Sequence, residues 1–449
     1  PLNWRQLFGV WPTGDFRVDP SSDAFALTHV LIAVVIIAAS LGLLAAWRRR
    51  WWPPWLYLAS AVIGVLLVSA KGSPWVQGKA FATASPAALL VGLIGAAALL
   101  EHAGRWMPWE SGRRALGLVR GRRAIAAVGA SAISLGVLWS NVLAYHQVTL
   151  APYGQFSELA QIGQRFAGQG PTLINDYQVY ATRHFLRNMD PESPSELRRR
   201  AIPLLNGQQV PKGGYADLDS FQLSAILTYR TIVLPTSPVA SRPPAPYQLV
   251  FNGRWYQVWQ RPASSAQVVL AHLGLGNPID PVGAPSCRRV RDLAREAGPG
   301  GMLAAVARPS PTVVAVPSPL PPGTAEAAFL ITTPGRYQIW LEGSFVRRLT
   351  TDVDGMRVGS AREQLNQAGQ WTPLADVHLS AAAHRVELSY GDAQLEPGSG
   401  VTGRAGPFLG VGPLAVAPVS GNPPVTYTYP SDARSLCGKR WDWIEAVSG

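Results

Sequence analysis

Four apolar segments in the first third of the chain constrain its fold more than any other feature. They cover residues 24–47, 52–70, 86–100 and 124–145. A helix needs about 20 apolar residues to cross a bilayer, with about 17 as the lower limit. The first, second and fourth segments reach this length, and the third is short unless it begins earlier. We therefore expect a transmembrane region of about four spans within residues 1–146.

The positive charge of the chain lies mainly beside these segments. The formal net charge is +12, and arginines cluster at residues 48–50 and 105–123. Such clusters are typical of cytoplasmic loops, whereas nucleic-acid binding would need the charge on an exposed face. Residues 1–23, the loop around residues 71–85 and everything after residue 146 then lie outside. We expect a multi-pass cell-membrane protein with a large extracytoplasmic C-terminal region and no nucleic-acid partner.

The chain has two cysteines, Cys287 and Cys437, and both fall in the part that we expect outside the cell. Disulfides form and persist there, so we expect these two to be bridged. The alternative is a pair of unpaired buried thiols.

Residues 147–262 alternate between segments with helical and with strand periodicity. Asn252-Gly253 stands between two alternating runs, which is a strong hairpin signal. We expect a small extracytoplasmic α/β domain here. Residues 263–449 begin with a Pro- and Gly-rich linker that holds one short basic helix, and short strands follow at regular spacing from about residue 325. This spacing predicts a C-terminal β-sandwich of the jelly-roll kind.

Three motifs in the C-terminal part carry a family resemblance: "PGRYQIWLEGSF", "VDGMRVG" and "GQWTPLADVHLSAAAHRVEL". In this order they resemble the galactose-binding-like jelly rolls that occur as carbohydrate-binding modules. Together with the membrane region, the chain resembles the C-terminal part of an actinobacterial glycosyltransferase of the GT-C type, such as the arabinofuranosyltransferases of the cell envelope. The resemblance implies a polyprenyl-phosphate sugar donor and an envelope glycan as acceptor.

The catalytic acidic residue of GT-C enzymes lies in their first external loop, and no residue here matches that motif. The chain also begins at Pro1 without a methionine. We therefore expect a catalytic residue, if there is one, upstream of this chain, in an N-terminal half or a separate subunit. The residues themselves leave the catalytic group unknown.

The loop around residues 71–85 is the main candidate site. It contains Lys71 and Lys79, two of only four lysines in the chain. Ser73-Pro74 and Ser85-Pro86 each read as a capping serine followed by proline at the first helical position. Two helix starts and two ammonium groups would concentrate positive potential, which suits a lipid phosphate. The alternative is that the lysines only reach lipid headgroups, as interfacial lysines do in many membrane proteins.

A second candidate group precedes and enters the first span: Trp11, Asp15, Arg17 and His29. A carboxylate and a guanidinium near the membrane surface could position a sugar or a phosphate. A solvated turn with a local ion pair is the alternative. Polar groups inside a span often mark a substrate path, which makes His29 a candidate.

In the predicted sandwich, four aromatic residues are candidate glycan-stacking platforms: Tyr337, Trp340, Trp371 and Tyr390. Aromatic side chains in strands more often belong to the core. Asp352 and Asp354 could hold a divalent cation, although a turn at Asp354-Gly355 needs aspartate anyway. We identify no other cofactor and no metal motif.

The function that we expect is a membrane glycosyltransferase, or its C-terminal part, that uses a polyprenyl-phosphate-linked sugar in envelope polysaccharide assembly. The alternative is a non-enzymatic membrane-anchored envelope protein that displays a glycan- or partner-binding β-sandwich. The sequence specifies neither sugar, linkage, acceptor nor oligomeric state.

Overall fold

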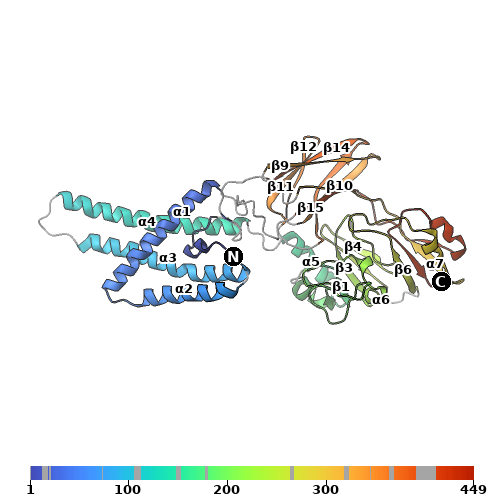
Figure 1. Ribbon diagram of the computed structural model, residues 1–449, viewed down its shortest axis with the longest axis horizontal. Helices are drawn as coiled ribbons and strands as arrows, with labels where there is room; N and C mark the ends of the chain where they lie inside the picture. The colour runs from blue at the N-terminus through green and yellow to red at the C-terminus, as the bar shows by residue number, and fades with distance from the viewer. Residues whose placement is uncertain are drawn as a thin grey trace. The chain divides into compact units, whose positions relative to one another are not determined.

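The structure is a computed structural model that describes residues 2–12, 19, 22–72, 74–105, 113–147, 153–176, 181–262, 267–317, 323–343, 345–363, 369–390 and 411–449. The chain divides into a helical unit within Pro1–Val148 and a β-rich unit within Thr149–Tyr390 and Pro407–Gly449 (Figure 1). Each unit is described separately below.

Four long helices follow a short 3-10 helix, η1, in the helical unit. Each has a stretch that is long and apolar enough to cross a membrane. The elements are η1 (Trp4–Phe8), α1 (Ser22–Arg48), α2 (Pro53–Lys71), α3 (Pro74–Arg105) and α4 (Arg113–Gln147). Leu67 and Val128 are 70% and 68% exposed. Apolar side chains exposed along whole helices are expected where lipid replaces water as the solvent.

The third span differs from the expected one. The span was expected over residues 86–100, but α3 begins at Pro74, so that Pro86 lies inside the helix. Proline removes one backbone donor from a helix, and a long transmembrane helix tolerates this loss when its neighbours support it. The arginines expected in a loop before the fourth span also lie in a helix, because α4 already begins at Arg113.

Helix α3 packs against the other three helices of its unit. It meets α1 at two glycines without intervening side chains. A Cβ atom on Gly95 would lie 1.9 Å from the carbonyl oxygen of Ala38, and one on Gly42 would lie 2.1 Å from that of Val91. Small residues permit this close approach of the two backbones. Between helices in lipid the hydrophobic effect contributes little, and van der Waals packing of this kind takes its place.

The two ends of the helical unit differ in charge. We call the end that holds Lys71 and the start of α3 the lysine end. The N-terminal segment also lies there, since the Leu2 N–H donates to Gln77 Oε1 at 3.0 Å. We call the opposite end the arginine end, where Arg49 pairs with Glu101. The alternation of the helices therefore separates the lysines from the arginine clusters.

The β-rich unit begins with α5 (Tyr153–Arg165) and a mixed five-stranded sheet in the order β2-β1-β3-β5-β4. β1 pairs in parallel with β2 and β3, and the other pairs are antiparallel. The Asn252-Gly253 turn joins β4 and β5 as predicted. The strands are β1 (Thr172–Ile174), β2 (Pro191–Glu192), β3 (Thr231–Pro235), β4 (Gln248–Asn252) and β5 (Tyr256–Gln260).

A second, antiparallel sheet occupies much of the stretch that we expected to be a linker. Its order is β16-β7-β17-β6, and α7 packs against it. The linker expectation underestimated this stretch because its short strands are completed by partners from the far end of the chain. The elements are β6 (Val269–Gly274), α7 (Cys287–Ala297), β7 (Met302–Ala305), β16 (Thr426–Thr428), η5 (Pro430–Leu436) and β17 (Trp443–Val447).

Two further four-stranded sheets share one apolar core, to which Ile339, Leu349 and Val386 contribute. Their orders are β13-β10-β15-β8 and β12-β11-β14-β9. The chain enters these sheets after β7 and leaves them before β16, so they form an insertion between two neighbouring strands of the second sheet. The strands are β8 (Thr312–Val314), β9 (Gly323–Leu330), β10 (Gly335–Gly343), β11 (Phe345–Val353), β12 (Met356–Glu363), β13 (Trp371–Leu379), β14 (Ala383–Tyr390) and β15 (Val411–Pro418).

The expected disulfide between Cys287 and Cys437 is confirmed, with 5.1 Å between the two Cα atoms. It joins the first residue of α7 to the residue that follows η5. The two cysteines are 150 residues apart in the chain, so the bond encloses the whole inserted pair of sheets.

The glycine contact between α1 and α3 predicts a position-specific effect. Gly95→Ala should lower the stability of the helical unit by about 1–3 kcal/mol, because the added Cβ meets backbone that cannot move aside. Gly64→Ala is the matched control, since a Cβ at Gly64 meets nothing within 4 Å. The midpoint of unfolding in detergent, followed by tryptophan fluorescence, measures both. Equal midpoints for the two variants would contradict the packing described here.

Removal of the disulfide should destabilise the second sheet. Replacing both cysteines with serine should cost about 2–5 kcal/mol, since the bond closes a long loop. Amide hydrogen exchange in α7 and β17 measures this loss. Ser435→Ala, at an exposed neighbour of the bridge, is the control and should leave exchange unchanged.

Candidate functional site

The two lysines of the main candidate site lie at the lysine end of the helical unit. Lys71 is the last residue of α2, and Lys79 lies in the second turn of α3. Both side chains are exposed. The first turn of α3 leaves N–H groups without helical acceptors, so positive potential from the backbone adds to that of the ammonium groups.

The two Ser-Pro pairs have different roles in the structure. α3 begins at Pro74, which agrees with a helix start at Ser73-Pro74, while Ser73 itself lies outside the described residues. Ser85-Pro86 is not a helix start, because both residues lie inside α3. The Ser85 hydroxyl donates to the Ala82 carbonyl oxygen at 3.3 Å instead of capping a helix. Of the two Ser-Pro pairs, only Ser73-Pro74 therefore coincides with a helix start at the lysine end.

Of the second candidate group, the structure describes Trp11 and His29, and each contacts a helix of the helical unit. Trp11 is half-buried, and its backbone N–H donates to Ser140 Oγ of α4 at 2.9 Å. His29 Nδ1 lies 2.7 Å from the Phe25 carbonyl oxygen of its own helix. Asp15 and Arg17 lie outside the described residues.

The aromatic residues expected as glycan platforms are core residues where the structure describes them. Tyr337, Trp340 and Trp371 are at most 8% exposed, so their rings offer no open face to a sugar. The Tyr337 hydroxyl donates to the Thr333 carbonyl oxygen at 2.6 Å. Strand alternation turns these three rings inward or against neighbouring segments. Tyr390 ends β14, and its side chain lies outside the described part.

The carboxylates of Asp352 and Asp354 are already engaged with basic groups and a backbone donor. Asp352 accepts from Arg357 Nε at 2.6 Å, and Asp354 contacts His384 Nδ1 at 2.7 Å and accepts from the Arg385 N–H. These contacts oppose the binding of a cation. Within the described residues, no group of three or more His, Cys, Asp or Glu side chains is placed to hold a metal ion.

A buried ionic cluster that the sequence did not predict joins the second sheet to the short 3-10 helix η4 (Leu218–Ser220). His272 on β6 contacts Glu445 Oε1 at 2.7 Å through Nδ1 and Asp219 Oδ1 at 3.0 Å through Nε2. Burial by itself lowers the pKa of His272, but the hydrogen bonds to the two carboxylates outweigh it and raise this pKa to about 10. The imidazole is therefore a cation at neutral pH.

Glu445 of β17 and Asp442, which directly precedes β17, accept backbone N–H groups of the loop before β4. Glu445 accepts the Ala245 N–H at 2.8 Å, and the Trp443 indole N–H donates to the Arg242 carbonyl oxygen at 2.9 Å. Asp442 lies 2.9 Å from Arg308 Nε and is fully buried. Burial raises the pKa of Asp442 to about 7, although the nearby Arg308 opposes this shift. These contacts fix the position of Arg242.

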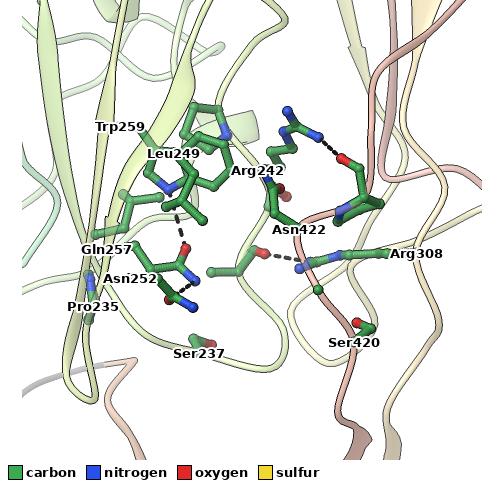
Figure 2. Close-up of a pocket in the computed structure, with 16 residues that line it drawn as sticks. Pro235, Ser237, Arg242, Leu249, Asn252, Gln257, Trp259, Arg308, Ser420 and Asn422 are labelled. Atoms are coloured by element: carbon green, nitrogen blue, oxygen red, sulfur yellow. Dashed lines mark hydrogen bonds between the residues drawn. The ribbon is translucent and has the colours of Figure 1, made fainter.

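A polar pocket with a volume of about 150 Å³ lies beside this loop (Figure 2). Asn252, Gln257 and Trp259 of the β4–β5 hairpin form one side, and Arg308 and Asn422 form the other. The sequence shows little that would identify this pocket. Its residues are far apart in the chain, and only the Arg within the Pro-rich stretch 235–246 and the polar residues at the hairpin turn give a weak signal.

The ionic cluster predicts how stability depends on pH. The unfolded histidine loses its proton near pH 6.5, whereas the folded one keeps it until about pH 10. The stabilisation is therefore complete below pH 6.5 and is lost as the pH rises toward 10, at up to about 1.4 kcal/mol per pH unit.

Amide exchange of β17 between pH 7.5 and 9.5, corrected for intrinsic rates, measures this slope. The His272→Gln variant should lose the slope, and His184→Gln, at an exposed histidine, should keep it. A flat profile in the unaltered protein would contradict a charged His272.

No family model matches the chain, and no curated protein matches it. Among solved structures, it is similar to a ruminal GH26 endo-β-1,4-mannanase over 23% of its length (14% identity, TM-score 0.16). It is also similar to the Podospora anserina GH26-CBM35 β-(1,4)-mannanase over 28% (8% identity, TM-score 0.19). A third match is a Paenibacillus sp. cycloisomaltooligosaccharide glucanotransferase, over 36% (10% identity, TM-score 0.15). The chain spans 19%, 29% and 18% of these proteins, and such TM-scores assign neither fold nor function.

Proposed function

We propose that the chain is part of a membrane glycosyltransferase of the GT-C type that uses a polyprenyl-phosphate-linked sugar in envelope polysaccharide assembly. The lysine end of the helical unit binds the donor phosphate in this proposal. The observation that carries it is the joint location of Lys71, Lys79 and the start of α3 at the end opposite the arginine clusters. A phosphate on a lipid tail is an anion that is confined to this depth.

The proposed orientation follows from the same charge separation. Arg49 and the arginine-rich start of α4 lie at the arginine end, which the positive-inside bias assigns to the cytoplasm. The lysine end then faces outward, and the β-rich unit is extracytoplasmic. The disulfide supports this placement, since such bonds persist in oxidising compartments.

The strands β8–β15 form the two sheets that share one apolar core, which we call the facing sheets. In this proposal they are the jelly-roll β-sandwich of a carbohydrate-binding module. Their two antiparallel sheets around one core support it. The proposed acceptor is an envelope glycan, and the catalytic acid belongs to an N-terminal half or a partner subunit. The buried Tyr337, Trp340 and Trp371 would then support the sheets and would not stack on sugar.

A second candidate is a non-enzymatic membrane anchor that displays a glycan- or partner-binding external part. The observation that favours it is the polar pocket of the β-rich unit, which is formed without any residue of the helices. The two functions differ in whether the lysine end recognises a polyprenyl phosphate.

We expect replacement of the two lysines to weaken lipid binding specifically. In nanodiscs of neutral lipid, the Lys71→Gln, Lys79→Gln double variant should bind a polyprenyl phosphate roughly 30-fold more weakly, at about 1 kcal/mol for each charge. Native mass spectrometry of the full chain measures the bound fraction. Lys439→Gln, at an exposed lysine of the β-rich unit, is the control and should bind as the unaltered chain does.

Two further lipids separate a donor site from general headgroup attraction. The neutral polyprenol should bind weakly to every variant. Phosphatidylglycerol should bind more weakly than the polyprenyl phosphate and should respond less to the double substitution. If the double substitution weakened the binding of both anionic lipids equally, the lysine end would not be a donor site. The membrane-anchor function would then be favoured.

A further inference from the structure

The polar pocket beside Arg242 has features of a binding site that the proposed function does not use. All its lining residues belong to the β-rich unit and come from three stretches of the chain: residues 234–259, Arg308 and residues 420–423. Its volume of about 150 Å³ is smaller than the roughly 300–1,000 Å³ of pockets for drug-sized ligands. One small ring with a substituent fits this space.

Two arginines, Arg242 and Arg308, line the pocket. Arg308 enters from one side, where its Nη2 donates to the Ala240 carbonyl oxygen and its Nε faces buried Asp442. Arg242 Nη1 donates to the Pro423 carbonyl oxygen, and its Nε is buried with no hydrogen-bond partner among the described residues. Asp442 pairs with Arg308, and Asp442 and Glu445 both lie near Arg242. Among the described residues neither carboxylate bonds the Arg242 guanidinium, so its Nε is the group that still needs an acceptor.

The hydrogen bonds of the hairpin side direct a further donor to the pocket. The Trp259 indole N–H donates to Gln257 Oε1 at 3.3 Å, and Gln257 Nε2 donates to Asn252 Oδ1 at 3.1 Å. This chain occupies the acceptor of Asn252 and leaves its amino group available (Figure 2). On the opposite side, Asn422 and Ser420 add an amide and a hydroxyl that line the pocket.

The arginines are held in place before any ligand arrives. The guanidinium of Arg242 lies over the Trp259 ring, 5.2 Å from its centroid, and β17 holds the backbone of Arg242 through Trp443. Arg308 is fixed by Asp442 and Ala240. Donors that are already oriented spare a ligand part of the ordering cost of binding.

We propose that this pocket binds a monosaccharide unit that carries one anionic group, either a carboxylate or a phosphate. The arginines pair with the anionic group, because guanidinium forks match the geometry of both anions. The amides and hydroxyls of Asn252, Asn422 and Ser420 suit a ligand with several hydroxyl groups, each of which both donates and accepts. This inference does not depend on the lysine end or on any glycosyl transfer.

Calorimetry of the full chain in nanodiscs tests the proposal with four probes: glucuronic acid, glucose 1-phosphate, glucose and inorganic phosphate. At least one of the two anionic sugars should bind at least ten-fold more tightly than glucose does, and at least ten-fold more tightly than inorganic phosphate does. The anionic sugar that binds with the higher affinity shows which anionic group the pocket prefers. No binding of either anionic sugar, or equal binding of glucose, would overturn the proposal, and equal binding of inorganic phosphate would leave an anion site without sugar recognition.

Two variants connect the binding to this pocket. Arg242→Gln should weaken the anionic sugar roughly ten-fold or more, as expected for a lost charged hydrogen bond. Arg254→Gln is the matched control, because Arg254 also lies over a tryptophan, 5.3 Å from the Trp255 centroid, but does not line the pocket. Unchanged affinity in Arg242→Gln would contradict the site.

A third variant remains informative if Arg242→Gln fails to fold. Asn422→Asp places a negative charge at an exposed position of the pocket and leaves the buried contacts intact. It should weaken the anionic sugar roughly ten-fold through like-charge repulsion, with an unchanged unfolding midpoint. Retention of full affinity with a normal midpoint would place the binding elsewhere.

Discussion

Two buried carboxylates, one on β17 and one directly before it, determine how the β-rich unit is assembled. Glu445 and Asp442 are fully buried, and burial of a charge is costly unless donors surround it. Glu445 obtains its donors from His272 and from the Ala245 backbone, and Asp442 obtains them from Arg308. Strand, loop and neighbouring sheet must therefore meet in one arrangement, since any other would leave a charge unpaired. The pocket beside Arg242 takes its shape from that requirement.

The helical unit depends on a different physical principle. Its helices are long and apolar enough to cross a membrane, and helices in lipid gain little from burying apolar side chains. The close backbone contact at Gly42 and Gly95 suits such helices. The two ends of the unit also differ in charge, with Lys71 at one end and Arg49 at the other. The cost of buried charge specifies the β-rich unit, and steric fit at these glycines specifies the helical unit.

Local patterns in the sequence predicted the elements that local physics determines. Apolar length predicted the four long helices, and turn chemistry predicted the Asn252-Gly253 hairpin. The expected pairing of Cys287 with Cys437 was also confirmed. Helix α3 began earlier than expected, because a proline inside a long apolar helix resembles a helix start when read alone. The pocket and the His272 cluster could not be predicted, since their residues meet only through strands paired across the whole β-rich unit.

The insertion of the facing sheets between β7 and β16 has a consequence for biosynthesis. β6 and β7 emerge early, but the strands that complete their sheet follow only after β15 has been made. Until then, the Ala245 N–H and His272 Nδ1 lack the Glu445 carboxylate that they contact in the folded chain. The pocket would thus be among the last features to mature, and a nascent chain interrupted after β15 would carry its facing sheets without a working pocket. Ligand binding there would report that translation had reached β17.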